Sequence, residues 1–563
     1  MRLLVIGVVA VCTWGARLRI NPDGIAYLDV SDYFLAHGLS DPHVGYWSPL
    51  FPFVLALARG IFGAGPQYER QIAHIVNFCV FIVALVAYEL FLRAQWRAVS
   101  TEMVDGEPGF PWTRRALAFF AFGYLLLTWM GVELVSASFM TPDMLTAAAL
   151  FAAAALVLHI EARAEHRHVI MQGAALGVVL GLGYLGKAVM FVVALVLLAT
   201  LAAHAFRRAR SLAPVAIATA CFLLTSAPGI WSASRVGGHL TFGDSGRLNY
   251  AWFIGGVPAP YWFVPGLPVP APLTRPAHVD PVHGVSLDTL SRLALLPRVY
   301  DIDRPSIGGT VPLWYDAVQW YPRAFRFTPS LRRQQHVLRQ NAMWLWGHFT
   351  LLFLGTLIVI AVSGRSLRGA WRVELTLIVP CIAVVVLYLF VYIETRYVGP
   401  FIIVAAVAAV AGAFAVRTDH ARAAAARVAR RAAMVVAVVQ ILRGLGAITD
   451  QVEFGLRDDV DGVLARAVVA SVGEHARVAI IGDPFAAHWT RLARSRVVAF
   501  VPPDEAEMYW AGADSARAAL VDSLRVLRVA LIVADQPPVA ARVDTTVWHS
   551  VPGAPEGTLV RRP

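Results

Sequence analysis

Long, mostly apolar runs recur along the first three quarters of the chain, separated by short polar stretches. About 20 such residues are enough for a helix to cross the hydrocarbon core of a bilayer. The first run is short, but no A-x-A cleavage site follows it, so we interpret it as a transmembrane helix with a cytoplasmic N-terminus rather than a signal peptide. The pattern predicts an α-helical polytopic membrane protein with about 11 transmembrane helices. The predicted helices cover residues 3–16, 71–92, 116–135, 142–160, 169–185, 188–206, 212–231, 342–363, 373–393, 397–416 and 432–449.

Arginine is concentrated in alternate connections between these runs. Short loops rich in Lys and Arg mark the cytoplasmic side of a membrane protein. Four connections show this. The one after the second run carries Arg93, Arg97, Arg114 and Arg115, and the one after the sixth carries Arg207, Arg208 and Arg210. The one after the eighth carries Arg365, Arg368 and Arg372, and the one after the tenth carries Arg417, Arg422, Arg427, Arg430 and Arg431. The connections that alternate with this side, after the odd-numbered runs, are therefore predicted to be extracytoplasmic.

Three of the predicted extracytoplasmic segments are long. In the first, residues 17–70, stretches 25–39 and 50–62 resemble short helices that lie in the membrane interface. The second, residues 232–341, is rich in Pro, Gly and aromatic residues. The third is a more polar tail.

Within the tail, residues 478–482 and 529–534 form buried-strand patterns with helical stretches between them. We therefore predict a transmembrane domain over 1–449 and a small extracytoplasmic α/β domain over 450–563.

Composition supports a membrane protein and argues against two other classes. Of 563 residues, 58% are hydrophobic and only 15% charged, and a soluble fold could not bury so much apolar surface. The net charge of +11 comes from Arg at the ends of apolar runs, and no nucleic-acid-binding module is visible, so we expect no nucleic-acid partner. The cysteines, Cys12, Cys79, Cys221 and Cys381, lie inside apolar runs without CxxC spacing. We interpret them as small buried hydrophobes rather than disulfides or metal ligands.

Two aspartates open predicted outer-side elements. Asp23 belongs to Asn21-Pro22-Asp23-Gly24, which is either ordinary turn chemistry or a carboxylate held at the membrane surface. On a helix, Tyr27 would share the face of Asp23, whereas Asp29 and Asp32 would share another. Asp143 follows Pro142 at the start of the fourth run, where an acid is common at a helix N-terminus and could equally serve a site.

Two cations also lie at predicted outer turns. Lys187 is the only lysine in the chain and lies in the tight connection after the fifth run. It is either a solvated charge or a compact ammonium that contacts a phosphate oxygen. Arg396 lies in Glu394-Thr395-Arg396-Tyr397, between the ninth and tenth runs. It either pairs with Glu394 to close a turn or holds a lipid phosphate through two hydrogen bonds.

With these motifs the chain resembles the GT-C superfamily of membrane glycosyltransferases, and within it the protein mannosyltransferase and aminoarabinose transferase group. The resemblance covers about residues 1–420. In chain order the matching pieces are Asp23-Gly24-x-x-Tyr27, Ser48-Pro49-Leu50-Phe51-Pro52-Phe53, Phe62-Gly63 with Arg70, Thr141-Pro142-Asp143, residues 181–187, and Glu394-Thr395-Arg396-Tyr397 leading into Pro400.

The resemblance implies transfer of a sugar from a polyprenyl-phosphate donor to an extracytoplasmic lipid, glycan or protein acceptor, with inversion at the anomeric carbon. Asp23 matches the family's catalytic base and Asp143 its second-loop carboxylate. The residues that match substrate-binding positions are Tyr27, Arg70, Lys187, Arg396 and Tyr397, of which the last three match positions near the donor phosphate. The implied location is the bacterial inner or plasma membrane, with an extracytoplasmic active site.

One departure from the family pattern affects the donor site. Some members carry a lysine before a Pro-Pro pair where this chain has Trp47-Ser48-Pro49. We therefore expect Lys187 and Arg396 to neutralise the phosphate. Two protein cations make a metal unnecessary, so we expect no required cofactor, although Asp23, Asp29, Asp32 and Asp143 leave a divalent cation open.

Two other functions fit the same scaffold. A transporter or lipid flippase is the main alternative, but such proteins often show repeated halves and mid-span ionisable groups. We find no internal repeat, and the distinctive charges lie at helix ends. A non-catalytic assembly protein is the second alternative, against which the acid and the two cations argue only mildly.

Overall fold

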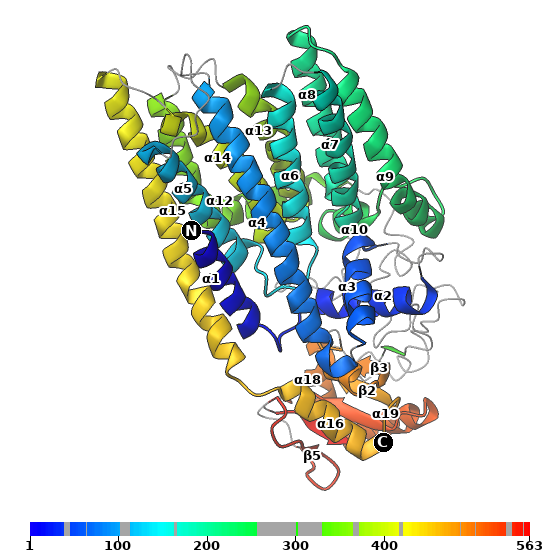
Figure 1. Cartoon of the computed structure of the whole chain (residues 1–563). Helices are drawn as coiled ribbons and strands as arrows, with labels where there is room; N and C mark the ends of the chain where they lie inside the picture. Colours follow the sequence, from blue (N-terminus) through cyan, green and yellow to red (C-terminus); the bar gives the residue numbers. More distant parts are fainter. Residues whose placement is uncertain are drawn as a thin grey trace.

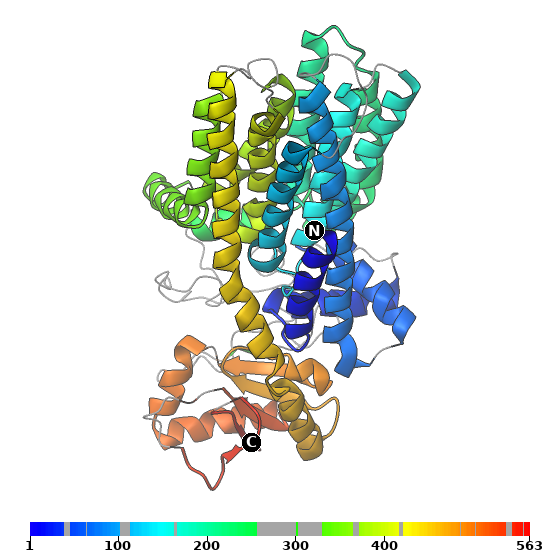
Figure 2. The same cartoon turned by 60° about the vertical axis from the view of Figure 1, so that its left-hand side comes forward.

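A computed structural model describes residues 1–38, 46–63, 65–101, 113–162, 166–255, 300–301, 329–363, 371–415, 420–484, 486–501, 503–535, 537, 543–555 and 557–563. Most of them belong to a bundle of helices that run roughly side by side, and a smaller α/β unit lies at one end of this bundle (Figures 1 and 2).

Each of the predicted apolar runs lies in a helix of the bundle. Within the described residues, eight helical stretches are long and apolar enough to cross a membrane, whereas the apolar parts of α1, α13 and α14 are shorter. The helices are α1 (Arg2–Gly15), α4 (Glu69–Thr101), α5 (Arg114–Trp129), α6 (Asp143–Ala162), α7 (His166–Gly186), α8 (Val189–Arg207), α9 (Ala213–Gly237), α12 (Leu331–Ser363), α13 (Trp371–Leu389), α14 (Thr395–Ala415) and α15 (His420–Gly455).

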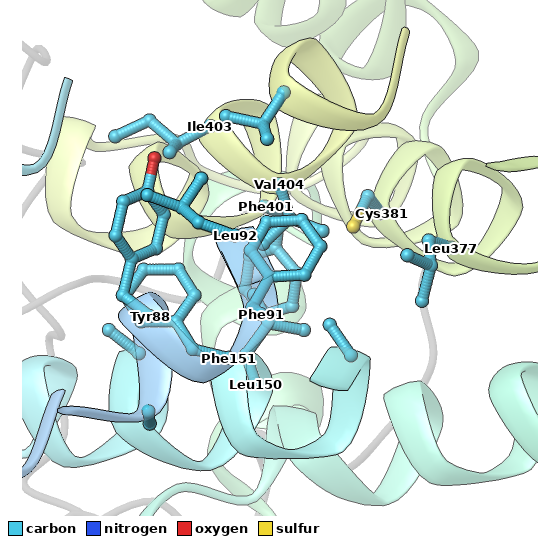
Figure 3. Close-up of a cluster of buried hydrophobic side chains, with 14 of the residues drawn as sticks. Tyr88, Phe91, Leu92, Leu150, Phe151, Leu377, Cys381, Phe401, Ile403 and Val404 are labelled. Carbon is cyan, nitrogen blue, oxygen red and sulfur yellow. The ribbon is translucent and has the colours of Figure 1, made fainter. Parts of the chain in front are cut away.

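Large apolar side chains fill the centre of the bundle. Figure 3 shows part of this core, where α4, α6, α13 and α14 meet. The Tyr88 and Phe151 rings pack edge to face with their centroids 4.7 Å apart, an arrangement that favours ring contact beyond simple burial. Cys12 and Cys381 are buried as expected, but Cys79 is exposed on α4, because apolar side chains of a membrane bundle also cover its outside.

Shorter helices lie between the bundle and the α/β unit. The predicted helices at 25–39 and 50–62 correspond to α2 (Pro22–His37) and α3 (Leu50–Phe62). They are followed by a 3₁₀ turn, η1 (Pro66–Tyr68). A further helix, α10 (Ser245–Phe253), follows α9. In Figure 1, α2 runs across the direction of the bundle, beneath its lower end.

In the part of the chain that the structure describes, the tail contributes helices and five strands to a six-stranded sheet, whose sixth strand is β1 (Tyr300–Asp301), in the order β1-β3-β2-β4-β6-β5. The central strands β2, β3 and β4 are parallel, and hydrophobic clusters cover the sheet on two sides. The strands predicted at 478–482 and 529–534 are β2 and β4. The elements are α16 (Val460–Val472), β2 (Arg477–Ile481), α17 (Trp489–Leu492), β3 (Arg496–Val501), α18 (Pro503–Ala511), α19 (Asp514–Val526), β4 (Leu531–Ala534), β5 (His549–Ser550) and β6 (Leu559–Arg561).

The three long segments predicted to share one side of the membrane contact one another. From the segment 232–341, β1 (Tyr300–Asp301) pairs with β3 of the tail. From the segment 17–70, Arg70 donates to Asp459 at 2.7 Å. The end of α8, with Arg207, lies at the opposite end of the bundle (Figure 1). Most of the Pro- and Gly-rich sequence in 232–341 lies outside the described residues, and α15 runs unbroken through the predicted boundary at 449.

Candidate active site

The start of α2 is held against the segment that leads into α6. Pro22 occupies the first turn of α2, where its fixed φ suits a helix start, and Asp23 follows it. The Asn21 side chain accepts a hydrogen bond from the Met140 backbone N–H at 3.0 Å. At Gly24 an added Cβ would lie 2.8 Å from the Met140 Cβ, so this close approach requires glycine. The contact brings the two predicted acidic loops together.

A cavity of about 630 Å³ opens beside these loops. Its wall combines the start of α2, the start of α6, the connection between α7 and α8, the helix α10 and the segment that joins α13 to α14. The polar residues predicted from the sequence that line it are Asp23, Tyr27, Asp143, Lys187, Arg396 and Tyr397. Residues from four distant parts of the chain therefore form one site.

The two predicted cations converge in this cavity. The Lys187 ammonium pairs with the Asp143 carboxylate. The Arg396 Nη1 lies 2.9 Å from Asp23 Oδ2 and 3.9 Å from Asp143 Oδ2. Both cations also face the Tyr397 ring, with Lys187 Nζ 3.9 Å and Arg396 Cζ 5.0 Å from its centroid. Such cation–π contacts favour positive charge at this position.

The two aspartates differ in exposure. The Asp143 side chain is 3% exposed, and its two oxygens face Lys187 and Arg396. The Asp23 side chain is 16% exposed. A carboxylate buried between cations can orient them, whereas a more accessible one can also take a proton from a substrate hydroxyl.

The Glu394–Arg396 pair that would close the turn is present. Arg396 Nε lies 2.5 Å from Glu394 Oε2, and Tyr392 donates to Glu394 Oε1 at 2.7 Å. The guanidinium nevertheless reaches past this turn to Asp23. The turn thus fixes one side of the guanidinium and directs the other side into the cavity.

Burial affects the packing of Tyr27 and the pKa values of both Tyr27 and Lys187. The Tyr27 ring is 2% exposed and packs against Trp47, 4.9 Å away, and Phe51, 5.1 Å away. Burial raises the pKa of Tyr27 well above its usual range. Burial lowers the pKa of Lys187, although the nearby Asp143 carboxylate opposes this shift.

Arg70 lies elsewhere. Its buried guanidinium donates to the Leu18 carbonyl at 2.8 Å and to Asp459 Oδ2 at 2.7 Å, and Asp461 is 3.8 Å away. These contacts join the start of α4 to α16. We therefore leave Arg70 out of the proposed site and assign it to the interface with the tail.

Asp29 and Asp32 belong to an ion-pair network that lies apart from the cavity, and of the two Asp29 is buried whereas Asp32 is partly exposed. Arg491 of the tail pairs with Asp29, lies 2.8 Å from Asp32 Oδ2, and contacts both oxygens of Glu69, at 2.9 and 2.8 Å. Arg59 adds a contact of 2.6 Å to Asp32. The local spacing of the two aspartates could not predict this network, because Arg491 is remote in sequence.

The four aspartates that left a divalent cation open therefore fall into two sets. Asp23 and Asp143 face Arg396, while Asp29 and Asp32 face Arg491. Among the described residues, no three His, Cys, Asp or Glu side chains are grouped so as to hold a metal ion.

A second cavity, of about 390 Å³, adjoins the first at the Asp23–Arg396 pair. The two cavities share Asp23, Tyr46, Trp47, Thr141, Tyr392, Arg396 and Tyr397. The second also reaches Glu133, Glu394 and Asp483. Asp23 thus borders both spaces.

Sequence reasoning did not assign several of these lining residues to the site. Tyr46 and Arg247 lie in segments predicted to be outside the membrane, and Tyr392 lies at the end of the helix predicted over 373–393; no motif distinguished these residues from their neighbours. Glu133 lies in a π-helical turn, η2 (Met130–Leu134), that ends α5. Such turns are frequent at functional sites, but they have no sequence signature that we could use.

No protein-family model matches the sequence, and no curated protein matches it by sequence. In structure the chain is similar to ArnT from Cupriavidus metallidurans in the apo state, with 15% identity, a TM-score of 0.50, and coverage of 99% of this chain and 97% of that one. It is also similar to the same protein bound to undecaprenyl phosphate (15% identity, TM-score 0.49, coverage 99% and 97%) and to the Archaeoglobus fulgidus oligosaccharyltransferase in complex with Zn and sulfate (12%, 0.47, coverage 94% and 67%). At 12–15% identity these similarities concern the fold alone. We base the argument on the first of them, whose TM-score is 0.50. The chain therefore has the fold of the GT-C aminoarabinose transferase ArnT, a helical membrane bundle with a small C-terminal α/β unit.

Proposed function

We propose that this protein is a membrane glycosyltransferase that takes a sugar from a polyprenyl-phosphate donor and transfers it to an acceptor hydroxyl on the extracytoplasmic side. The observation that carries the proposal is the convergence of Lys187 and Arg396 with Asp23 in one cavity of about 630 Å³. Cations that meet beside a carboxylate supply what sugar transfer from a phosphodiester needs. They neutralise the leaving phosphate, while the carboxylate accepts the proton of the attacking hydroxyl.

In this proposal the donor phosphate contacts Lys187 and Arg396. Each cation already has a carboxylate partner, so a bound phosphate takes over part of these pairings. Lys187 offers a compact point charge, and Arg396 offers a planar fork that matches a phosphate. Asp143, behind both cations, acts as a positioning residue.

The chemical step we propose is a single displacement at the anomeric carbon. The acceptor oxygen forms a bond to that carbon while the bond from the carbon to the phosphate oxygen breaks. The hydroxyl proton passes to Asp23, and the electron pair leaves on polyprenyl phosphate, whose charge the two cations balance. Attack from the side opposite the leaving group inverts the configuration. Asp23 is suited to this role because it borders both cavities.

The test uses the purified full chain in lipid nanodiscs. We expect saturable binding of polyprenyl monophosphate and, with one of a panel of polyprenyl-phosphate hexoses and pentoses, release of polyprenyl phosphate that accelerates when alkyl glycosides are added, detected by mass spectrometry. Absence of phosphate binding by the folded protein would contradict the proposal. Transfer of intact donor across a vesicle membrane without bond cleavage would favour a flippase instead.

A further inference from the structure

The two cavities that share Asp23 differ in charge. Among the described residues, the 630 Å³ cavity is lined by three basic and two acidic side chains: Lys187, Arg247, Arg396, Asp23 and Asp143. The 390 Å³ cavity is lined by one basic and four acidic side chains: Arg396, Asp23, Glu133, Glu394 and Asp483. An anion is therefore favoured on one side of Asp23 and disfavoured on the other.

The acidic side chains of the smaller cavity are held in place by their surroundings. The Trp129 indole N–H donates to Glu133 Oε2 at 2.8 Å. Tyr392 donates to Glu394 Oε1 at 2.7 Å. Because these hydrogen bonds hold Glu133 and Glu394 in place, both carboxylates stay in the wall of the cavity.

Asp483 reaches the same cavity from the tail. It follows Gly482, whose backbone φ of 139° lies in a region that residues other than glycine rarely adopt. An added Cβ at Gly482 would also lie 2.8 Å from the Asp535 side chain. The sharp turn after β2 therefore places an acid of the α/β unit in the wall of a cavity that the membrane domain forms.

The only basic side chain among the described residues of this wall is already shared. Arg396 contacts Asp23 at 2.9 Å and Glu394 at 2.5 Å, and it belongs to the donor cavity as well. A phosphate on the acceptor would lie among four carboxylates and compete with the donor phosphate for this one guanidinium. Uncharged hydroxyl groups, in contrast, can donate hydrogen bonds to carboxylates.

We propose that the smaller cavity is the acceptor site and that its charge selects an uncharged saccharide acceptor against a phosphorylated one. This inference rests on the proposed function, because it takes Asp23 as the base between donor and acceptor. It adds a substrate class, a neutral polyol, and gives the α/β unit a part in acceptor selection through Asp483.

The test compares hexyl maltoside with hexyl maltoside phosphate as ligands of the full chain in nanodiscs, by calorimetric titration, with the larger cavity saturated beforehand by polyprenyl monophosphate. We expect the neutral compound to bind at least tenfold more tightly. A carboxylate about 8 Å from a bound anion changes its affinity by roughly two- to thirtyfold, for effective dielectric constants from that of water to about 20. Glu133→Gln and Asp483→Asn should therefore each strengthen binding of the phosphate by about tenfold, and high salt should reduce the difference.

Glu474→Gln serves as the matched control, because it removes the same charge from an exposed pair with Arg494. It should leave the preference unchanged. Equal binding of the two compounds by the wild-type protein, or no response to either cavity variant, would overturn the inference. If polyprenyl monophosphate still binds in that case, the donor site stands and only the acceptor class is wrong. If it does not bind, the proposed function itself fails.

Discussion

Asp23 and Tyr27 lie four residues apart on α2, and both line the donor cavity. Helical spacing alone predicted that they share a face, and that Asp29 and Asp32 share another. Spacing could not predict which cations each face meets, because Arg396 and Arg491 come from distant parts of the chain. The candidate site was therefore predictable as a set of residue types at helix ends, and its pairings were not.

Replacing Asp23 tests the proposed base. Asp23→Asn keeps the side-chain shape and removes the basicity, so we expect folding to persist and turnover to fall by roughly 10²-fold or more. Turnover is measured as release of polyprenyl phosphate, and folding by thermal unfolding. Asp514→Asn, at an exposed position on α19, is the control for a charge change alone. Near-normal turnover in Asp23→Asn would make Asp143 the next candidate.

Replacing Arg396 tests the donor site. Hydrogen bonds to charged groups contribute about 1.5–3 kcal/mol each, so Arg396→Ala should weaken binding of polyprenyl monophosphate by roughly ten- to hundredfold. Titration of the purified protein in nanodiscs measures this change. Arg207→Ala, at the opposite end of the bundle, should bind the phosphate like the wild type. A similar loss in both variants would mean that the effect is not local to the cavity.

At the scale of elements, the apolar runs predicted every bundle helix, because a run long enough to cross a bilayer has few other structures open to it. The tail was less predictable. The strand β3 (Arg496–Val501) is a short run of mostly buried residues, and hydrophobic periodicity cannot distinguish such a strand from a buried helical segment. The contact between the tail and residues 17–70 depends on ion pairs between residues that are far apart in sequence.

That contact is expected to make stability depend on pH. Burial raises the pKa of Asp29 to about 7, against the opposing effect of Arg491, from an ordinary value near 4. Between these pH values the folded state keeps a proton that the unfolded state has released. The contribution of Asp29 to stability should therefore fall as pH rises from about 4 to 7, with a slope of up to about 1.4 kcal/mol per pH unit. Thermal unfolding in detergent measures it.

Asp29→Asn removes the titrating group, so its unfolding temperature should vary less over the same range. Asp522→Asn, at an exposed carboxylate, should keep the wild-type dependence. The same pH dependence in the wild type and in Asp29→Asn would show that Asp29 stays ionised in the fold.

At the scale of the whole molecule, α15 links the two ends of the bundle. It begins near the arginine-rich end and runs down one side into the α/β unit (Figure 2). The arginine pattern then predicts that the α/β unit is extracytoplasmic. Reporter fusions after Gly455 and after Pro563 should both read as outside, with a fusion after Arg207 reading as inside. A cytoplasmic signal at either of the first two positions would reverse the orientation.

The position of Arg491 bears on how such a chain could be shortened or recombined. A cut at the end of α15 removes the guanidinium that contacts Asp29 and Glu69, both of which are buried. If another tail covered these acids without such a guanidinium, Arg59, 3.5 Å from Glu69, would be the cation left to them among the described residues. Breaking a buried pair by removing one partner costs about 3–5 kcal/mol. The tail therefore cannot be exchanged on its own for that of another protein. A chimera that takes it from another protein must also take the acids of the first outer segment, so the two ends of the sequence form a matched set.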